Sequence, residues 1–177
     1  IIDDMSARYR VDPRRVFLVG HSNGGFLAHR IACDRSDRIA GIVSLAGATW
    51  NDPARCAPTS PVAVLQVHGT ADAVIAYNGG ATMLPGAPGA GGTYPAARTS
   101  VARWAGYNRC DTSPTRDATR LDVDGVLLGA ETTVDRHARC AGGAAELWTI
   151  ENGTHIPALV TNWPTMIYDF LMAHPRP

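Results

Sequence analysis

A serine flanked by glycines lies between an apolar segment and an amphipathic segment near the start of the chain. The stretch VFLVGHSNGGFLAHR contains GHSNG at residues 20–24, a match to the pattern G-x-S-x-G centred on Ser22. Residues 16–19 are β-branched, aromatic or apolar, which predicts a buried strand, and a helix is predicted to begin near Asn23. A strand, this turn and a helix form the context in which G-x-S-x-G presents a nucleophilic serine.

The residue types in this stretch have physical roles beyond the pattern. Glycines permit a strained turn that lifts the Ser22 hydroxyl away from a sheet. The start of the following helix offers free N–H groups and the positive end of its dipole, so the backbone N–H of Asn23 is a candidate oxyanion-hole donor. The alternative is a glycine-rich turn in which Ser22 only caps a helix.

Helical and strand-like segments alternate along the rest of the chain. Apolar spacing predicts helices over residues 1–10, from Asn23 onward, over 97–109 and over 163–171. Continuous apolar runs predict strands over residues 39–47, 62–69 and 145–150. Residues 121–135 suggest a short hairpin that turns at Asp124-Gly125, and the glycine- and proline-rich residues 79–95 suggest an excursion without regular structure. This order predicts an α/β fold with a mostly parallel sheet and helices on both faces.

Two helices are specified in more detail. In the second helix Phe26, Leu27, Ile31 and Ala32 are expected to form the buried face. In the last helix Trp163, Met166, Ile167, Phe170 and Leu171 follow the i, i+3, i+4, i+7, i+8 spacing of a buried stripe, and Asn162 is the predicted N-cap. Residues 1–177 are expected to form a single domain.

A serine nucleophile needs a base, and the base needs an acid that orients it. His155 is the candidate base, because it lies in the polar loop ENGTH between the last predicted strand and the last predicted helix. Such a loop lies over the carboxyl ends of the strands, where Ser22 would also be displayed. The other histidines after the serine occupy a helix, a strand end, an arginine-rich segment and the tail: His29, His68, His137 and His174.

Asp72 is the candidate acid, because VHGTADAV places it just past the strand 62–69. Aspartates in turns commonly only bond their own backbone, which is the alternative role for this residue. Asp111, Asp117 and Asp135, in the later and less regular part of the chain, are rival candidates.

Composition and charge exclude several other classes of protein. Sixteen basic and sixteen acidic residues cancel, and neither sign forms a block, so neither nucleic acid nor an anionic membrane is expected as a partner. No apolar run approaches the roughly 18 residues of a membrane span. The sequence shows no signal peptide, no cluster with zinc-ligand spacing and no cofactor motif, so neither a metal nor a cofactor is expected.

Four cysteines suggest two disulfides and an oxidising compartment, with four buried thiols as the alternative. Four cysteines allow three pairings. Cys33–Cys56 and Cys110–Cys140 are the predicted pairs, because each brackets a compact sequence unit.

Three segments together resemble secreted α/β-hydrolases of the polyhydroxybutyrate depolymerase and feruloyl esterase type. They are RVFLVGHSNGG, VLQVHGTADAVIAYNGG and ELWTIENGTH, and the resemblance extends over nearly the whole chain. It implies Ser22 as nucleophile, Asp72 as acid and His155 as base. It also implies that Tyr77 and Asn78 lie near the site, and that the protein is secreted or periplasmic.

The mechanism implied is hydrolysis of an ester through an acyl-enzyme, with a small-molecule or polymeric ester as substrate. Trp50, just after the strand 39–47, is a candidate aromatic wall for an acyl or aryl group, although a buried or interface tryptophan would look the same. A serine peptidase and a non-catalytic binding protein on a hydrolase scaffold are the alternatives.

The early position of the nucleophile strand leads to one more expectation. In the family that the chain resembles, several strands precede this point, and a loop after an early strand supplies the second oxyanion donor. The resemblance therefore implies that residues 1–177 are the C-terminal part of the catalytic domain. Alternatively, a second copy or a partner segment would cover the sheet edge beside residues 16–19.

Overall fold

The computed structural model of the protein describes residues 1–81 and 92–177, and within them helices and strands alternate. The helices are α1 (Ile2–Arg8), α2 (Asn23–Asp34), α3 (Ala97–Tyr107) and α4 (Trp163–Ala173), with a 3-10 turn at Pro53–Arg55. The strands of the main sheet are β1 (Phe17–His21), β2 (Gly41–Leu45), β3 (Ala63–Gly69), β6 (Thr115–Arg116), β7 (Thr132–His137) and β8 (Ala144–Ile150). Gly80–Ala81 and Thr93–Tyr94 pair as the small strands β4 and β5.

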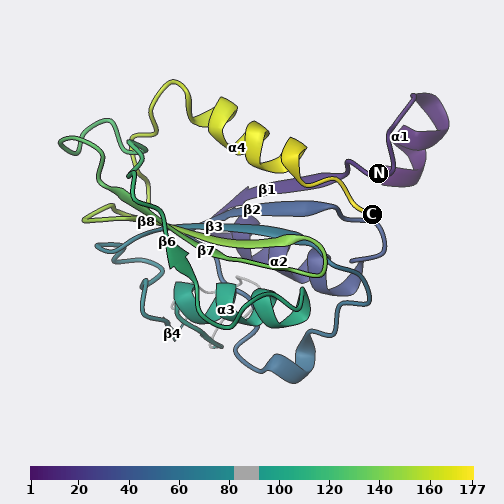
Figure 1. Cartoon of the computed structure of the whole chain (residues 1–177), viewed down its shortest axis with the longest axis horizontal. Helices are drawn as coiled ribbons and strands as arrows, with labels where there is room; N and C mark the ends of the chain where they lie inside the picture. The colour runs from purple at the N-terminus through teal and green to yellow at the C-terminus, as the bar shows by residue number, and fades with distance from the viewer. Residues whose placement is uncertain (82–91) are drawn as a thin grey trace.

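The main sheet is mostly parallel. Its order is β1-β2-β3-β8-β7-β6, in which the first four strands run parallel and the last two run antiparallel to their neighbours. Helix α4 covers one face, and α2 and α3 cover the other (Figure 1). The predicted α/β class with helices on both faces is confirmed.

The parallel register brings the ends of distant segments together. His21, at the end of β1, pairs with Leu45 of β2, and Gly69, at the end of β3, pairs with Ile150 of β8. The loops that follow β1, β3 and β8 therefore leave the same edge of the sheet, where open α/β sheets bind their ligands.

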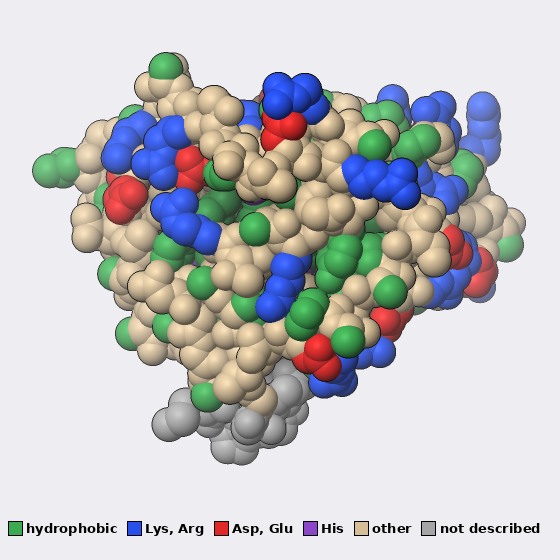
Figure 2. Space-filling model, turned by 60° about the horizontal axis from the view of Figure 1, so that its bottom comes forward, with side chains coloured by type: hydrophobic (Ala, Val, Ile, Leu, Met, Phe, Trp, Pro, Cys, Tyr) green, Lys and Arg blue, Asp and Glu red, His purple; other side chains and the backbone are tan. Residues whose placement is uncertain are grey.

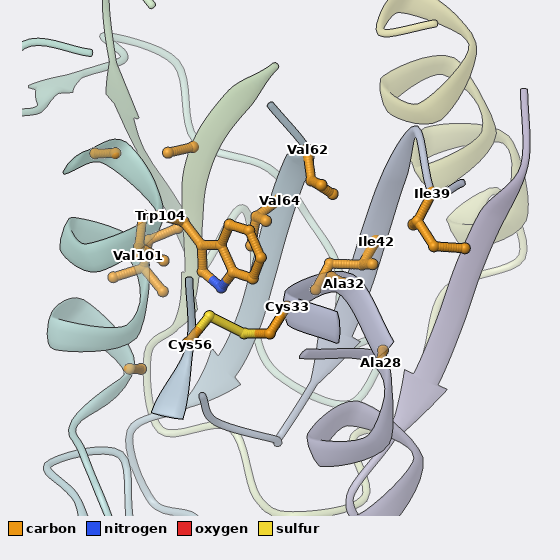
Figure 3. Packing of buried hydrophobic residues seen from close by; sticks show 14 of the residues in the cluster. Ala28, Ala32, Cys33, Ile39, Ile42, Cys56, Val62, Val64, Val101 and Trp104 are labelled. Carbon is orange, nitrogen blue, oxygen red and sulfur yellow. A yellow bond between two sulfur atoms is a disulfide. The ribbon is translucent and has the colours of Figure 1, made fainter. Parts of the chain in front are cut away.

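Apolar side chains fill both sides of the sheet. Between the sheet and α2 and α3, Trp104 is fully buried, and Figure 3 shows its indole lying beside Val64 and the disulfide between Cys33 and Cys56. On the other face, α4 buries the predicted stripe: Trp163, Phe170 and Leu171 are buried, and Met166 and Ile167 pack against them.

Both predicted disulfides are confirmed: Cys33 bonds Cys56, and Cys110 bonds Cys140. The first joins α2 to the segment that leads into β3, and the second joins the end of α3 to the turn between β7 and β8. Each bridge therefore ties a covering helix to the sheet beneath it.

Two details of the prediction are wrong. The strand β1 is only half-buried, with Val19 57% exposed, because β1 lies at an edge of the sheet. Leu27 is 52% exposed, because α2 turns the neighbouring Ala28 and His29 into the core instead. Asn162 occupies the N-cap position of α4 as predicted, but its side chain makes no capping bond. Pro164 in the first turn supplies a residue that has no N–H to satisfy.

The ambiguous segments are now defined in part. Leu121 and Thr132 form an isolated antiparallel bridge, but Asp124 pairs with Leu159, so residues 121–135 do not form the predicted hairpin at Asp124-Gly125. Residues 132–137 form β7, which pairs with β6 and β8 instead. Of the predicted excursion 79–95, residues 82–91 lie outside the described part of the chain. No helix in the described ranges is long and apolar enough to cross a membrane.

Candidate active site

Ser22 lies at a sharp turn between β1 and α2. Its backbone has φ +56°, an uncommon conformation for a residue with a side chain, and such strain gathers at functional sites. The turn is pinned by two backbone bonds: Ser22 N–H donates to the carbonyl of Leu45, and Phe26 N–H donates to the carbonyl of Ser22. A Cβ at Gly20 would lie 2.1 Å from the carbonyl oxygen of Gly24, so a glycine is required there for strand and helix to meet.

Ser22, His155 and Asp72 form a continuous hydrogen-bonded series. The Ser22 Oγ lies 2.9 Å from Nε2 of His155, and Nδ1 of His155 lies 2.8 Å from Oδ2 of Asp72. Because an ionised carboxylate only accepts, the Nδ1–H of His155 donates to Asp72, which leaves Nε2 to accept from the hydroxyl. The arrangement can withdraw a proton from Ser22 and stabilise the imidazolium that forms.

The loop that carries His155 is held from the side of β3. A Cβ at Gly69 would lie 2.1 Å from the carbonyl oxygen of Gly153, so the end of β3 and the histidine loop touch backbone to backbone. Asn152 N–H donates to the Thr70 hydroxyl at 2.7 Å. These contacts fix where the loop leaves the sheet.

Two further contacts hold the loop beyond the histidine. Ala158 N–H donates to Oδ1 of Asp124, in the turn before β7. His21 Nε2–H donates to the backbone carbonyl of His155 at 2.8 Å, and the two imidazole rings lie 4.9 Å apart. The second residue of the GHSNG motif therefore supports the backbone of the candidate base.

The Asp72 carboxylate is buried and surrounded by donors. Burial would raise its pKa, but hydrogen bonds from His68, His155 and the N–H groups of Ile75 and Val74 together hold the pKa well below its ordinary value. Asp72 thus remains ionised at neutral pH, as an acid that orients an imidazole must.

The three rival aspartates lie elsewhere and pair with arginines. Asp111 contacts Arg139, Asp117 contacts Arg136, and Asp135 contacts Arg116 and Arg98. Of the candidate acids, Asp72 is the one that the structure brings to His155.

Trp50 lies beside a pocket near the serine-bearing helix. The pocket is lined by Phe26, Leu27, His29, Arg30, Ala48, Thr49 and Trp50. The Arg55 guanidinium lies 3.5 Å from the centre of the Trp50 ring, and Arg103 donates to the Trp50 carbonyl, so the indole is held in place. Its Nε1–H is buried without a partner among the described residues.

Tyr77 and Asn78 differ in position. Tyr77 is buried, its hydroxyl lies 2.9 Å from Oγ1 of Thr149, and its ring meets the ring of His68 edge-on. Burial raises the pKa of the Tyr77 phenol. Asn78 is exposed in the adjoining turn. Tyr77 therefore packs behind the acid, on the side away from solvent.

Asn23 is the first residue of α2, so its N–H is one of those that a helix leaves without an intrahelical partner. It is placed directly after Ser22, as an oxyanion donor must be. In the described ranges no group of three or more His, Cys, Asp or Glu side chains could hold a metal ion.

The buried polar residues behind Asp72 were not identified from the sequence, namely His68, which lies beside the Asp72 carboxylate, and Gln66, which lies beside His68. Both interrupt the apolar strand VAVLQVHG, and a spacing of two residues puts their side chains on the same face of that strand. Polar side chains on a strand buried on both faces must bond one another or a neighbour, and this was the available signal.

Charged side chains of both signs are mixed on the face of the molecule drawn in Figure 2. Figure 2 shows arginine side chains scattered over one face of the molecule, with acidic side chains beside several of them. Ion pairs between exposed or part-exposed side chains include Arg30–Asp34, Arg35–Asp37 and Arg38–Asp3.

Comparisons with known proteins agree with the fold. A family model described as Phospholipase/Carboxylesterase matches residues 1–85. The chain is 35% identical over 102 residues to NocK of Nocardia uniformis subsp. tsuyamanensis, covering 58% of this chain and 30% of NocK. It is 27% identical over 158 residues to feruloyl esterase B of Piromyces equi, covering 87% of this chain and 27% of that protein. The chain thus spans about 30% of the length of these curated relatives.

A solved structure shows the same architecture. The acetyl xylan esterase of Aspergillus awamori superposes with a TM-score of 0.55 at 12% identity, over 96% of this chain and 64% of that one. Together these findings show an α/β-hydrolase-type fold with a mostly parallel sheet. In sequence the chain is similar to proteins that are named as esterases.

Proposed function

We propose that the protein is a serine hydrolase of carboxylic esters, with Ser22 as nucleophile, His155 as base and Asp72 as the acid that orients it. One observation carries the proposal: the Ser22 Oγ lies 2.9 Å from His155 Nε2, and His155 Nδ1 lies 2.8 Å from Asp72 Oδ2. The three residues come from loops after three different strands, and the strained turn at Ser22 presents the hydroxyl.

The proposed reaction has two stages. His155 accepts the Ser22 proton while Oγ attacks the ester carbonyl, and the Asn23 N–H donates to the oxygen that becomes negative. His155 then gives its proton to the departing alcohol, which leaves an acyl group on Ser22. A water molecule, deprotonated by His155, attacks the acyl group, and the carboxylic acid is released.

The names of relatives suggest the class of ester. Feruloyl esterase B and a bifunctional acetylxylan esterase/xylanase of Neocallimastix patriciarum, 32% identical over 77 residues, are both named for ester hydrolysis. The pocket beside Phe26 and Trp50 has an apolar lining suited to an acyl or aryl group. We include feruloyl or other aryl esters, short-chain esters and polyhydroxyalkanoates among the candidate substrates.

The two disulfides support a protein that works outside the cytoplasm, since such bonds persist in oxidising compartments. Secretion, or export to a periplasm, is therefore part of the proposal.

Hydrolysis of p-nitrophenyl acetate by the Ser22→Ala and His155→Ala variants tests the assignment. Both should lose roughly 10⁴- to 10⁶-fold in kcat, as triad knockouts do. Ser6→Ala, on the exposed helix α1, is the matched control and should keep full activity.

Near-normal turnover by Ser22→Ala would refute the assignment. Equal or faster cleavage of an aminoacyl-p-nitroanilide by the unmodified protein would identify a peptidase instead. No hydrolysis of either substrate, with a correctly folded chain, would favour a binding protein on a hydrolase scaffold.

A further inference from the structure

A buried series of polar side chains continues from Asp72 away from Ser22 and across the core. Trp104 on α3, His29 on α2, and Gln66 and His68 on β3 are each at most 1% exposed. Trp104 Nε1 lies 2.9 Å from His29 Nδ1, and His29 Nε2 lies 2.9 Å from Gln66 Oε1. Gln66 Nε2 lies 3.3 Å from His68 Nδ1, and His68 Nε2 lies 3.3 Å from Asp72 Oδ2.

The direction of every hydrogen bond in this series follows from groups that can only donate or can only accept. An indole nitrogen only donates, so His29 Nδ1 accepts from Trp104, and the His29 proton lies on Nε2 and points at Gln66 Oε1. Gln66 Nε2 also donates to the carbonyl of Gly47 at 3.0 Å, which independently fixes the orientation of the amide.

The same reasoning determines the tautomer of His68. Gln66 Nε2–H donates to His68 Nδ1, so the proton of a neutral His68 lies on Nε2. There it bonds the carbonyl of Ile75 at 2.8 Å, and Oδ2 of Asp72 lies 3.3 Å from the same nitrogen. The carbonyl only accepts and so requires the same tautomer. Both ends of the series thus agree on one arrangement of protons.

We propose that His68 is a positioning residue for ester hydrolysis, because its Nε2–H holds the same Asp72 oxygen that receives the Nδ1–H of His155. The proposal rests on the proposed function, in which Asp72 orients the base. His68 lies away from the serine, behind the carboxylate, so it acts through Asp72 rather than on the substrate.

The series supplies hydrogen bonds to Asp72 without supplying positive charge. Burial lowers the pKa of His29 to about 4, so this ring is neutral near pH 7. An Asp72 carboxylate that is bonded by neutral groups keeps its full negative charge, which is what stabilises an imidazolium at His155. A lysine or arginine in the place of His68 would cancel that charge.

The titratable groups around the acid come from four segments. They are His68 on β3, His155 after β8, His21 at the end of β1, and Tyr77 in the loop after Asp72. The Tyr77 phenol in turn interacts electrostatically with three charged groups farther from Asp72, which are Arg98, Asp135 and Glu151.

A purely structural role is the competing explanation, because the bond to Ile75 is shorter and fixes the loop 70–75. Two amide variants separate the explanations. The amide of Asn lies where Nδ1 of the ring is, so His68→Asn keeps a partner for Gln66 but withdraws the donor from Asp72. The longer side chain of Gln reaches the Nε2 position, so His68→Gln keeps a donor to Asp72.

The experiment measures kcat and KM for p-nitrophenyl acetate from pH 4 to 9, per site titrated with a fluorophosphonate, so that misfolded protein is not counted. In His68→Asn, kcat should fall roughly 10- to 100-fold, because Asp72 loses a donor that holds it in place against His155, and a hydrogen bond to a charged group contributes on this scale. KM should stay within about twofold, because His68 is buried and touches no substrate. The acidic limb of the profile should move to higher pH, since a carboxylate with one donor fewer stabilises an imidazolium more strongly.

His68→Gln should have a kcat close to that of the unmodified protein, and the acidic limb of its pH profile should lie close to the original position. If His68→Asn yields no titratable sites, His68→Leu serves instead, because it withdraws the same donor from Asp72, and it should shift the acidic limb in the same direction. An acidic limb that stays in place or moves to lower pH, or equal kcat per site in the two amide variants, would overturn the inference.

Ser22→Ala is measured alongside, so that a failure of the proposed function can be told apart from a failure of the positioning role of His68. Labelling at Ser22 with an unmoved profile in His68→Asn would contradict the positioning role alone. A protein whose Ser22 is not labelled would contradict the proposed function, and the positioning role with it.

Discussion

Two buried aspartates in this protein are held in opposite ways. Asp72 and Asp135 are 6% and 5% exposed. Asp72, after β3, is bonded by two histidine rings and two backbone N–H groups. Asp135, on β7, is bonded by Arg116 at 2.8 and 2.9 Å and by Arg98 at 3.1 Å.

Both surroundings keep the carboxylate ionised, but with different consequences. The Arg116 guanidinium holds the pKa of Asp135 below its usual range and also cancels its charge. The donors to Asp72 lower its pKa and leave its charge in place. Burial and a low pKa therefore do not distinguish these two carboxylates, whereas the positive charge of the partners of Asp135 does.

The largest expected effect compares one substitution at the two positions. Asp72→Asn should lower kcat about 10⁴-fold, because an amide can donate to His155 Nδ1 and so favour the tautomer that cannot accept the Ser22 proton. Asp135→Asn should leave kcat within about twofold and lower only the free energy of unfolding, because it leaves Arg116 without its partner. Steady-state kinetics and urea unfolding of both variants provide the measurement, and equal losses of kcat would erase the distinction.

The disulfides give the next largest effect, on stability. Removing Cys33–Cys56 or Cys110–Cys140, which span 23 and 30 residues, should each lower the free energy of unfolding by about 3–4 kcal/mol on the chain-entropy estimate. Paired Cys→Ala variants in denaturant titrations test this. The kcat of the folded fraction should not change, since neither bridge contacts Ser22, Asp72 or His155. A large fall in kcat per titrated site would show that α2 needs its bridge to hold the serine.

The smallest expected effect concerns the neutral groups behind Asp72. Unfolded His29 takes up a proton near pH 6.5, whereas folded His29 does so only near pH 4. The unfolded chain thus binds more protons between these values, so stability is full above pH 6.5 and declines as the pH falls toward 4. His29 should contribute roughly 2–3 kcal/mol to the loss of unfolding free energy between pH 7 and 4.5. His29→Gln should unfold with a shallower dependence over this range, and an unchanged slope would show that His29 is not held neutral.

Much of the fold could be predicted because its signals are local. The apolar runs 39–47 and 62–69 contain β2 and β3, and the run 145–150 covers β8 except for its first residue. The period of the final helix indicates the face that α4 buries. Leu27 shows the limit of this reasoning. The apolar residues of α2 span more than one face, and contacts with the sheet decide that Ala28 and His29 face inward.

The three residues of the candidate site could be predicted from the sequence, but the hydrogen bonds that hold them in place could not. Ser22, Asp72 and His155 each follow a predicted strand, so the parallel topology brings them together. The bonds that hold them, from His21 to the backbone of His155 and from His68 to Asp72, depend on ring orientations that a sequence does not specify.

Covalent labelling tests the central claim most directly. A fluorophosphonate should add one phosphonyl group to the protein, on the tryptic peptide of residues 16–30 that contains Ser22. Labelling should be as fast in Asp135→Asn as in the unmodified protein. It should be slower by orders of magnitude in Asp72→Asn and His155→Ala, because the labelling rate depends on how strongly the serine is activated as a nucleophile. An adduct on another peptide, or equal rates in the two aspartate variants, would contradict the account.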